Sequence, residues 1–501
     1  MFYLSAVPPV DRNLRRTLTA LSIWAAAAAL ITAALLRYIK QPSFWLDEAF
    51  VAVSLRDPSP AEIFGRLEYG QFFPRIYLGA IALLRHFAGY QIWSLRLLPL
   101  IFFALATCCW VLLLIKRSRS SIVAALVGAA LLTGSNLWLD QSIQLKQYTL
   151  DVFFALLPFL LDDGFLDETL RSGRRKALLL LLMTPALVSY TYGLAVIARI
   201  AGWYVWQERD KRRLSVSAAT IALSSLALCL AILWFTDLRF NALDRQAYVS
   251  YWGDCILGNV APRSPAAGLR LLAKFLWGWH SRQPLVIAVV APLQIAGAWS
   301  LFNRWRSREN CEWGSRSAGS VTVLSLVIVA SAAGIYPLCA GRLTLFCQPH
   351  LQLLAIDGAI FFACASKRSA VWRVAILSGA VIVMFFSVTR YLEFVRAEPE
   401  ENLTPVVGLI DGQVASRVIV HPCSVAQVRA LPRPLPVEVV LTSVESNRLT
   451  PMPQEGERYW VLWTHLGADY CVTTLDELKA SARNWRVVYD GPRAGLALAE
   501  F

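Results

Sequence analysis

The sequence has little charge for its length, and fewer acidic than basic residues. Only 16% of its 501 residues are charged and 56% are hydrophobic, so the mean hydropathy is positive. Soluble chains are about 45–50% apolar and about a quarter charged. The apolar excess lies in blocks of roughly 15 to 24 residues, about the length of a helix that crosses a bilayer core. One very large soluble core is therefore disfavoured, and a multi-pass membrane protein is predicted.

No cleavable signal peptide is predicted, and no internal repeat or low-complexity segment is visible outside the main loops. The first apolar block, residues 17–38, is too long for the apolar core of a signal peptide and has no convincing cleavage site. The net charge of +14 would suit nucleic acid, but the basic residues fall in short clusters between the apolar blocks. Such clusters mark cytoplasmic loops. Membrane lipids are therefore the predicted surroundings, and nucleic acid is excluded as a partner.

The basic clusters predict a topology of eleven crossings. Arg12, Arg15 and Arg16 precede the first block, so the N-terminus is expected in the cytoplasm. A shorter apolar piece, residues 73–84, carries Arg75 and is interpreted as an interfacial helix on the outer surface. The predicted crossings are residues 17–38, 93–115, 121–139, 148–161, 177–189, 193–206, 214–235, 284–302, 318–338, 346–364 and 371–388.

The chain changes character after the last crossing, which divides it into a membrane module, residues 1–390, and a C-terminal domain, residues 391–501. In this domain β-rich runs and helical patches alternate between Pro-rich turns, which predicts a small α/β domain of about a hundred residues on the outer side. The predicted fold class is mainly α, a polytopic helical bundle with interfacial helices in the first outer loop and a C-terminal α/β domain. The β-rich runs are residues 417–420, 437–441, 459–463 and 486–489, and the helical patches are residues 425–430 and 475–482.

Two adjacent carboxylates, Asp47 and Glu48, follow the first crossing in the segment FWLDEAF. A charged residue at the centre of a membrane helix costs about 2.5–3.5 kcal/mol on insertion scales, so a carboxylate at membrane level usually has a function. This interpretation predicts two catalytic residues. In the alternative interpretation the two acids begin a helix and complement its dipole.

Further candidates lie at the outer ends of other crossings. Lys146 and Tyr148 offer a cation and a hydroxyl at headgroup level, or else anchor their helix in the interface. Arg342 is the only charge in its short outer loop and suits a phosphate, because guanidinium matches phosphate oxygens bidentately. Anchoring in the headgroups is the alternative for Arg342. Asp140 either faces the same space as Asp47 or is solvated.

Tyr192 and His280 complete the set as candidate substrate-binding residues. His280 lies in a long outer loop, residues 236–283, among aromatic residues that either stack on sugar faces or form an interfacial belt. The charge bias alone defines the outer face, and all of the candidates fall on it. This agreement favours a site on that face.

Several segments resemble the GT-C membrane glycosyltransferases, in the branch of the protein O-mannosyltransferases, the aminoarabinose transferases and similar bacterial galacturonosyl or mannosyl transferases. The resemblance covers the membrane module and is only generic in the C-terminal domain. The segments are WLDEA after the first crossing, QFFPRIYL from Gln71, RLLPLIFFALAT from Arg96, QLKQYTLDVFFALL from Gln144, SYTYG from Ser189 and YPLCAGRLTLF from Tyr336.

The resemblance implies an enzyme, a hexosyl- or pentosyltransferase with a polyprenyl-phosphate sugar donor, a periplasmic active site and inversion at the anomeric carbon. Asp47 would be the general base on the acceptor hydroxyl, and Glu48 would orient it or a neighbouring group. Lys146, Arg342 and Tyr148 would hold the donor phosphate. The resemblance also implies a bacterial inner membrane and a role in the synthesis of cell-envelope glycans or glycolipids.

The sequence departs from the family at one position. Relatives often carry His or Lys just before the proline of the segment entering at Phe73, whereas here Phe72 and Phe73 precede Pro74, and Arg75 follows it. Either Arg75 replaces that cation at the phosphate or the donor is held differently. The sugar, the acceptor (a glycan, lipid or protein) and the oligomeric state are left open.

No His/Asp cluster has the spacing of a metal site, so no cofactor is predicted, although a divalent cation at Asp47 is left open. Two outer cysteine pairs are candidate disulfides in an oxidising periplasm, Cys423 with Cys471 and Cys339 with Cys347. The alternative function is a lipid-linked sugar or solute transporter. Transporters place ionisable groups near the midplane and often show inverted repeats. Here the charges collect at one face and no repeat is visible, which favours the enzyme.

Overall fold

The computed structural model forms two compact units, and each is described by itself. The bundle unit comprises Met1–Leu35, Pro99–Ile143 and Gln147–Val395, and the mixed unit comprises Leu36–Leu98, Gln144–Lys146 and Arg396–Phe501. The described residues are 12–69, 71–118, 121–171, 187–207, 216–235, 252–280, 284–309, 313–339, 341–365, 369–396, 401–445, 448–450, 453–464, 469–491 and 493–501.

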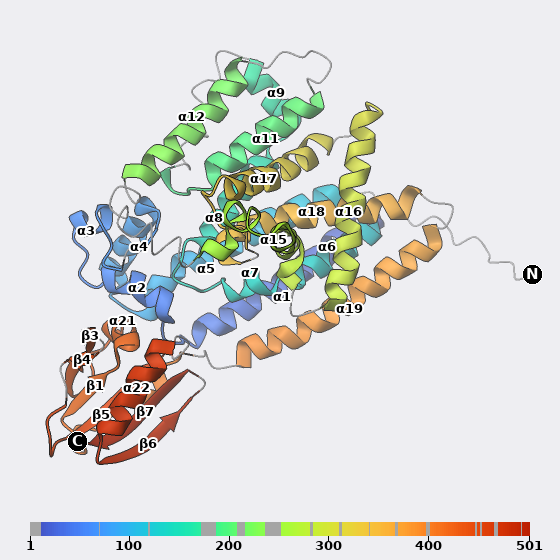
Figure 1. The fold of residues 1–501 in the computed structure, drawn as a ribbon. Helices are drawn as coiled ribbons and strands as arrows, with labels where there is room; N and C mark the ends of the chain where they lie inside the picture. Colours follow the sequence, from blue (N-terminus) through green and yellow to red (C-terminus); the bar gives the residue numbers. More distant parts are fainter. Residues whose placement is uncertain are drawn as a thin grey trace, which may run out of the picture. The chain divides into compact units, whose positions relative to one another are not determined.

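The described part of the bundle unit is helical (Figure 1). Two of its helices continue into the mixed unit, namely α1 at its C-terminal end and α5 at its N-terminal end. The helices are α1 (Arg12–Ile39), α5 (Ile92–Ser118), α6 (Ile122–Thr133), α7 (Asn136–Asp140), α8 (Tyr148–Leu160), α9 (Asp163–Arg171), α11 (Tyr192–Gln207), α12 (Val216–Leu233), η5 (Gly253–Cys255), α14 (Leu257–Val260), α15 (Pro265–Trp277), η6 (Gly278–His280), α16 (Pro284–Arg306), α17 (Gly314–Ala332), η7 (Arg342–Cys347), α18 (Gln348–Ala365) and α19 (Ser369–Arg396).

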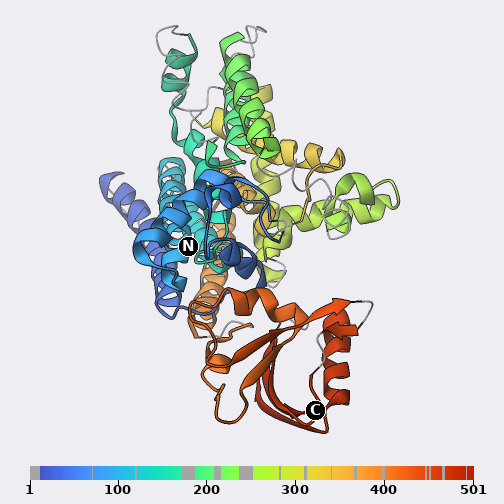
Figure 2. The same ribbon diagram turned by 90° about the vertical axis from the view of Figure 1, so that its left-hand side faces the viewer.

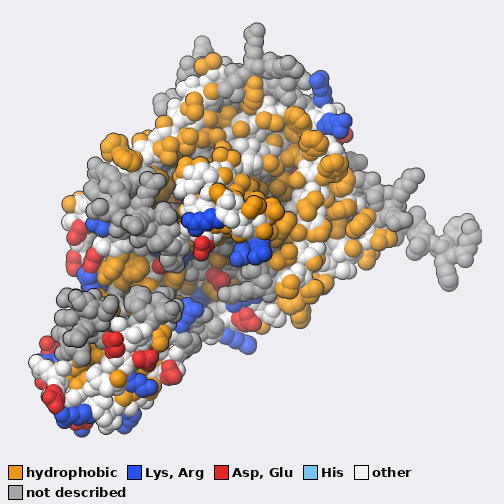
Figure 3. Space-filling model, viewed as in Figure 1, with side chains coloured by type: hydrophobic (Ala, Val, Ile, Leu, Met, Phe, Trp, Pro, Cys, Tyr) orange, Lys and Arg blue, Asp and Glu red, His pale blue; other side chains and the backbone are white. Residues whose placement is uncertain are grey.

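The protein is a multi-pass membrane protein. Among the described residues, 6 helical segments are long and apolar enough to cross a bilayer. Their surfaces carry large apolar side chains, such as Val374 and Phe385 of α19, and hydrophobic side chains cover most of the helices in Figure 3. Apolar surface of this extent requires a lipid environment or a partner. The segments are Arg16–Ile39, Ile92–Ser118, Pro284–Arg306, Gly314–Ala332, Arg342–Ala363 and Ala370–Arg396.

The count of eleven crossings remains a prediction. Three shorter apolar helices, Ile122–Thr133, Tyr148–Leu160 and Ala222–Leu233, coincide with other predicted crossings. The predicted crossing 177–189 lies outside the described residues up to residue 186. The predicted helix 121–139 is wrong as a single helix, because α6 ends at Thr133 and α7 begins at Asn136.

The break between α6 and α7 has a packing cause. A Cβ atom on Gly134 would lie 2.8 Å from Cγ1 of Val383 in α19, so a larger residue here would force Val383 or the backbone to shift. The next side chain, Ser135 Oγ, donates a hydrogen bond to the Leu131 carbonyl at 2.8 Å and accepts one from Gln352 Nε2 at 2.9 Å. The chain therefore turns out of α6 where two other helices contact it.

Glycines also let two other helix pairs pack closely. A Cβ atom on Gly297 of α16 would lie 1.9 Å from the Leu354 carbonyl oxygen of α18, and one on Gly358 of α18 would lie 1.8 Å from the Leu293 carbonyl oxygen. A Cβ atom on Gly202 of α11 would likewise lie 2.3 Å from a backbone nitrogen of α17. Small residues at helix contacts are typical of membrane bundles, where packing replaces the hydrophobic effect as the driving force.

The mixed unit combines short helices with a sheet. Figures 1 and 2 show its strands gathered at the C-terminal end of the chain. The helix predicted over residues 73–84 is present as α4, and its exposed side chains include Leu83 and Phe87, whereas its place in the membrane interface stays a prediction. The elements are α2 (Leu46–Ser54), α3 (Pro60–Phe64), α4 (Arg75–Ala88), α20 (Thr404–Val407), β1 (Arg417–Val420), η8 (Pro422–Ser424), α21 (Val425–Arg429), β2 (Glu438–Leu441), β3 (Ser443–Glu445), β4 (Arg448–Thr450), β5 (Arg458–Thr464), α22 (Asp469–Ser481), β6 (Asn484–Asp490) and β7 (Ala494–Glu500).

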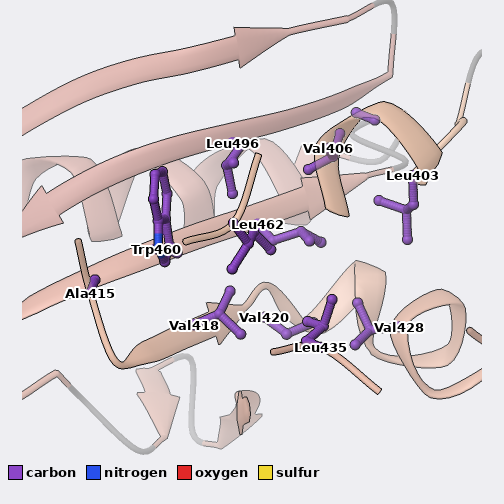
Figure 4. Close-up of a cluster of buried hydrophobic side chains, with 12 residues drawn as sticks. Leu403, Val406, Ala415, Val418, Val420, Val428, Leu435, Trp460, Leu462 and Leu496 are labelled. Carbon is purple, nitrogen blue, oxygen red and sulfur yellow. The ribbon is translucent and has the colours of Figure 1, made fainter. Parts of the chain in front are cut away.

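The main sheet has five strands in the order β2-β1-β5-β7-β6. β1 is parallel to both β2 and β5, whereas β7 is antiparallel to β5 and β6. Both faces are covered. One core, drawn in Figure 4, packs β1, β5 and β7 against α20 and α21, and the other packs the opposite face against Leu478 of α22. The four predicted β-rich runs are confirmed as β1, β2, β5 and β6, whereas β7 and the β3–β4 hairpin were not predicted.

Candidate functional site

A buried ion pair fixes the beginning of α2. Arg96 Nε donates to Glu48 Oε1 at 2.9 Å and Arg96 Nη2 donates to Glu48 Oε2 at 2.5 Å. Their side chains are only 4% and 1% exposed. Such a two-bond guanidinium–carboxylate pair fixes orientation as well as charge. Arg96 Nη1 also donates to the Pro42 carbonyl at 2.5 Å, which ties the segment entering α2 to α5.

The same carboxylate connects α2 to the segment that carries Lys146. Glu48 Oε1 accepts the backbone N–H of Leu145 at 2.6 Å, and Glu48 Oε2 accepts that of Trp45 at 3.4 Å. Lys146, which is buried, donates from Nζ to Gln71 Oε1 at 2.6 Å. The three residues Gln144–Lys146 therefore belong to the mixed unit although the chain on both sides of them belongs to the bundle unit.

A second carboxylate, from the C-terminal part of the chain, reaches the same turn. Glu401 Oε2 accepts the backbone N–H of Leu46, the first residue of α2, at 2.9 Å. The first N–H groups of a helix have no partner within the helix, and negative charge beside them is favourable. Glu48 and Glu401 therefore stabilise the N-terminus of α2 together.

Asp47 lies between these two anchors, in the first turn of α2, and its side chain is half-buried. The two adjacent acids of the sequence thus differ in environment. Glu48 is almost completely buried and accepts hydrogen bonds from Arg96, Leu145 and Trp45, which suits an orienting group. Asp47 retains contact with solvent on a turn held from two sides, which suits a group that reacts with a substrate.

Arg75 is also in the mixed unit, at the start of α4, but it is only 1% exposed. Its Nη1 donates to the Ile63 carbonyl of α3 at 3.4 Å. This hydrogen bond connects α4 to α3, and the assignment of Arg75 to the donor phosphate stays a prediction.

The other candidates belong to the bundle unit. Tyr148 is the first residue of α8 and is buried, and Arg342 begins η7 and is half-buried. Tyr192 begins α11, is buried, and its ring contacts that of Phe154 edge-on at 6.0 Å between centroids.

Asp140 and His280 are the two remaining candidates of the bundle unit. Asp140 ends α7 and pairs with Arg390 of α19, with 3.1 Å between Oδ1 and Nη2. His280 is the last residue of η6, and its side chain lies outside the described part of the chain.

Three residues that hold the site were not predicted from the sequence. Arg96 had a recognisable signal, because an arginine in an apolar run usually has a buried partner. Gln71 begins the family-like segment QFFPRIYL but was not chosen as a site residue, and Glu401 lies in an ordinary polar stretch and acquires its role only through a distant contact.

The described residues contain no group of three His, Cys, Asp or Glu side chains that could hold a metal ion. The predicted Cys339–Cys347 disulfide is wrong, because both thiols are free, Cys347 being buried within η7. Cys339 instead contacts the thiol of Cys255, and burial raises its pKa to about 12. Cys423 is disulfide-bonded, whereas the side chain of its predicted partner, Cys471, lies outside the described part.

Fold and site together define a multi-pass membrane protein with an anchored acidic turn. No family model matches the chain, and no curated protein matches it. Two crystal structures of ArnT from Cupriavidus metallidurans are similar, one in the apo state and one bound to undecaprenyl phosphate. Each has 12% sequence identity and a TM-score of 0.49, and the matches cover 94% and 95% of this chain and 97% of each ArnT chain. At these values the likeness assigns no function.

Proposed function

We propose that the protein is an inverting glycosyltransferase of the periplasmic face of the bacterial inner membrane. It would transfer a hexose or pentose from a polyprenyl-phosphate carrier to an acceptor hydroxyl in the synthesis of cell-envelope glycans or glycolipids. The observation that carries the proposal is the anchoring of Asp47 between Glu48 and Glu401. A general base must be held within hydrogen-bond reach of the proton that it removes.

In the proposed reaction Asp47 accepts the proton of the acceptor hydroxyl while the hydroxyl oxygen bonds to the anomeric carbon. The bond from that carbon to the phosphate oxygen breaks, and polyprenyl phosphate departs with the electron pair. Lys146 would stabilise this leaving group, and it is joined to the same turn because the N–H of Leu145 binds Glu48. One acid near the acceptor is sufficient for a single displacement, unlike the paired acids of glycosidases.

Arg342 and Tyr148 are proposed to hold the donor phosphate with Lys146. Arg75, which is buried like Lys146 and Tyr148, is a further proposed member of this group. Asp140, Tyr192 and His280 remain proposed substrate-binding residues. A divalent cation at Asp47 also remains a proposal, and the effect of a chelator on turnover tests it.

The experiment is turnover by the purified protein in nanodiscs with a panel of polyprenyl-phosphate sugars and envelope extracts as acceptors. We expect release of polyprenyl phosphate with one donor, together with a glycosylated product of inverted anomeric configuration. The rival function is tested in proteoliposomes. Movement of an intact lipid-linked sugar or solute across the membrane, without release of polyprenyl phosphate from any donor, would contradict the transferase.

A further inference from the structure

The sheet of the mixed unit has a topological switch point between β1 and β5. After β1 the chain passes through α21 to β2, which pairs with one edge of β1 in parallel. The other edge of β1 pairs in parallel with β5. Open α/β sheets bind their ligands outside the carboxyl ends of the strands at such a point. The residues at these ends therefore show what the crevice holds.

Buried polar side chains lie at the end of β5 and in the segment after β1, and they bind one another. Thr464 ends β5, and its N–H donates to Ser424 Oγ at 2.6 Å. The Thr464 hydroxyl donates to the side-chain oxygen of Gln427 in α21. Gln427 Nε2 then donates to Glu401 Oε2 at 2.7 Å. Each of these side chains is at most 5% exposed. A carboxylate of the chain itself is thus part of the hydrogen-bonded group at the end of β5.

Glu401 continues this chain of hydrogen bonds to α2. The oxygen that accepts from Gln427 also accepts the N–H of Leu46, the residue before Asp47. A parallel link runs beside it, because Ser43 Oγ accepts the N–H of Leu403 at 2.7 Å. The hydrogen bonds therefore run without interruption from the end of β5 to the first turn of α2.

We infer that Glu401 is a positioning residue for Asp47 and that the C-terminal domain serves as the rigid support of the catalytic turn. The effect of Glu401 on catalysis by Asp47 rests on the proposed function. The hydrogen bonds that connect Glu401 to α2 do not. A buried carboxylate that accepts two hydrogen bonds on one oxygen holds both donors at fixed positions. Loss of the link lets α2 shift, and a misplacement of about 1 Å costs on the order of 100-fold in rate.

The experiment compares Glu401→Leu and Glu401→Gln with the control Glu438→Leu, a glutamate of β2 in the same domain whose side chain is 64% exposed. We expect Glu401→Leu to lower kcat by about 10- to 100-fold and to leave the KM for the donor within a few-fold. Glu401→Gln keeps an oxygen for both hydrogen bonds, so kcat should return to within a few-fold of the wild type. Equal losses in both variants, or a loss confined to KM, would overturn the positioning role.

Hydrogen exchange tests the link without any activity. The amide hydrogens of Leu46 and the following turn should exchange faster in Glu401→Leu than in the wild type. In Glu438→Leu their exchange rates should equal those of the wild type. Unchanged exchange in Glu401→Leu overturns the inference, whatever the kinetics. A wild type that transfers no sugar overturns the proposed function, and exchange alone then decides the link. If Glu401→Leu does not fold, Gln427→Leu replaces it and should show a smaller effect of the same sign.

Discussion

Both units bury arginine–carboxylate pairs that join two helices, but the helices differ in length and in the residues that they carry. In the bundle unit, Arg117 of α5 pairs with Asp357 of α18, and Ser317 of α17 donates to the same carboxylate at 2.6 Å. Arg199 of α11 likewise pairs with Asp163 at the start of α9. These pairs connect α5 to α18 and α11 to α9 within the bundle unit.

In the mixed unit the pair of Arg96 and Glu48 joins the long helix α5 to the first turn of the short helix α2. Glu401 holds the same turn from the C-terminal domain. The residue between these contacts is the half-buried Asp47. The same kind of interaction thus joins helices of the bundle unit and, in the mixed unit, fixes the turn that carries the proposed base. The predictions below test this difference, from the largest expected effect to the smallest.

The first prediction removes one arginine from each unit. Arg96→Leu and Arg117→Leu each leave a buried carboxylate without its cation, which costs about 3–5 kcal/mol of unfolding free energy. Turnover per folded molecule should fall strongly in Arg96→Leu and stay within about two-fold of the wild type in Arg117→Leu. Of the two arginine pairs, only the pair of Arg96 with Glu48 contacts α2. Thermal unfolding and active-site-normalised turnover measure the two effects.

The double variant Glu48→Leu with Arg96→Leu is the control. It should recover part of the lost stability, because no unpaired charge stays buried, but not the turnover. An equal loss of turnover per folded molecule in Arg117→Leu would remove the distinction between the units.

The second prediction concerns pH in the mixed unit. Burial lowers the pKa of His421 to about 4, against about 6.5 in an unfolded chain. The unfolded state then binds the proton more tightly, so stability is complete above pH 6.5 or so and falls as the pH drops towards about 4. The expected loss is about 3 kcal/mol. Protonation would also remove the acceptor at Nδ1 for the N–H of Cys423.

Thermal unfolding of the C-terminal domain between pH 7 and pH 4 measures this effect. His421→Gln should be less stable at pH 7 and should show a shallower pH dependence. If His421→Gln lost stability with falling pH as steeply as the wild type, groups other than His421 would be responsible for the loss.

The third prediction concerns the donor phosphate. Lys146→Met removes a buried cation, and a hydrogen bond to a charged group contributes about 1.5–3 kcal/mol. The KM for the donor should therefore rise by roughly 10- to 100-fold. Lys116→Met is the matched control, because Lys116 forms a half-exposed pair with Asp162 in the bundle unit. If the KM for the donor were the same in Lys146→Met as in Lys116→Met, Lys146 would not bind the donor phosphate.

Much of the fold could be predicted from the sequence. Long apolar blocks mark the helices, and runs of β-branched and aromatic residues mark β1, β2, β5 and β6. β7 was missed because its sequence, AGLALAE, is poor in strand-forming residues. Its pairing depends on tertiary packing, since a Cβ atom on Gly495 would lie 2.1 Å from the Trp463 ring in β5.

The site was predictable only in part. Asp47 and Glu48 could be chosen as candidates because two adjacent acids after a predicted crossing are unusual. The sequence could not separate their roles, since these depend on Arg96, 48 positions away from Glu48, and on Glu401, 355 positions away from Leu46. Contacts over such separations leave no local pattern.

The most direct test of the central claim compares Asp47→Asn with the wild type in single-turnover release of polyprenyl phosphate from the active donor. Asp57→Asn is the matched control, because Asp57 follows α2 and its side chain is 91% exposed. If Asp47 is the base, a folded Asp47→Asn should lose about 100- to 10,000-fold in rate, while Asp57→Asn keeps the wild-type rate. Wild-type release by a folded Asp47→Asn would contradict the assignment of the base and the role given to the anchored turn.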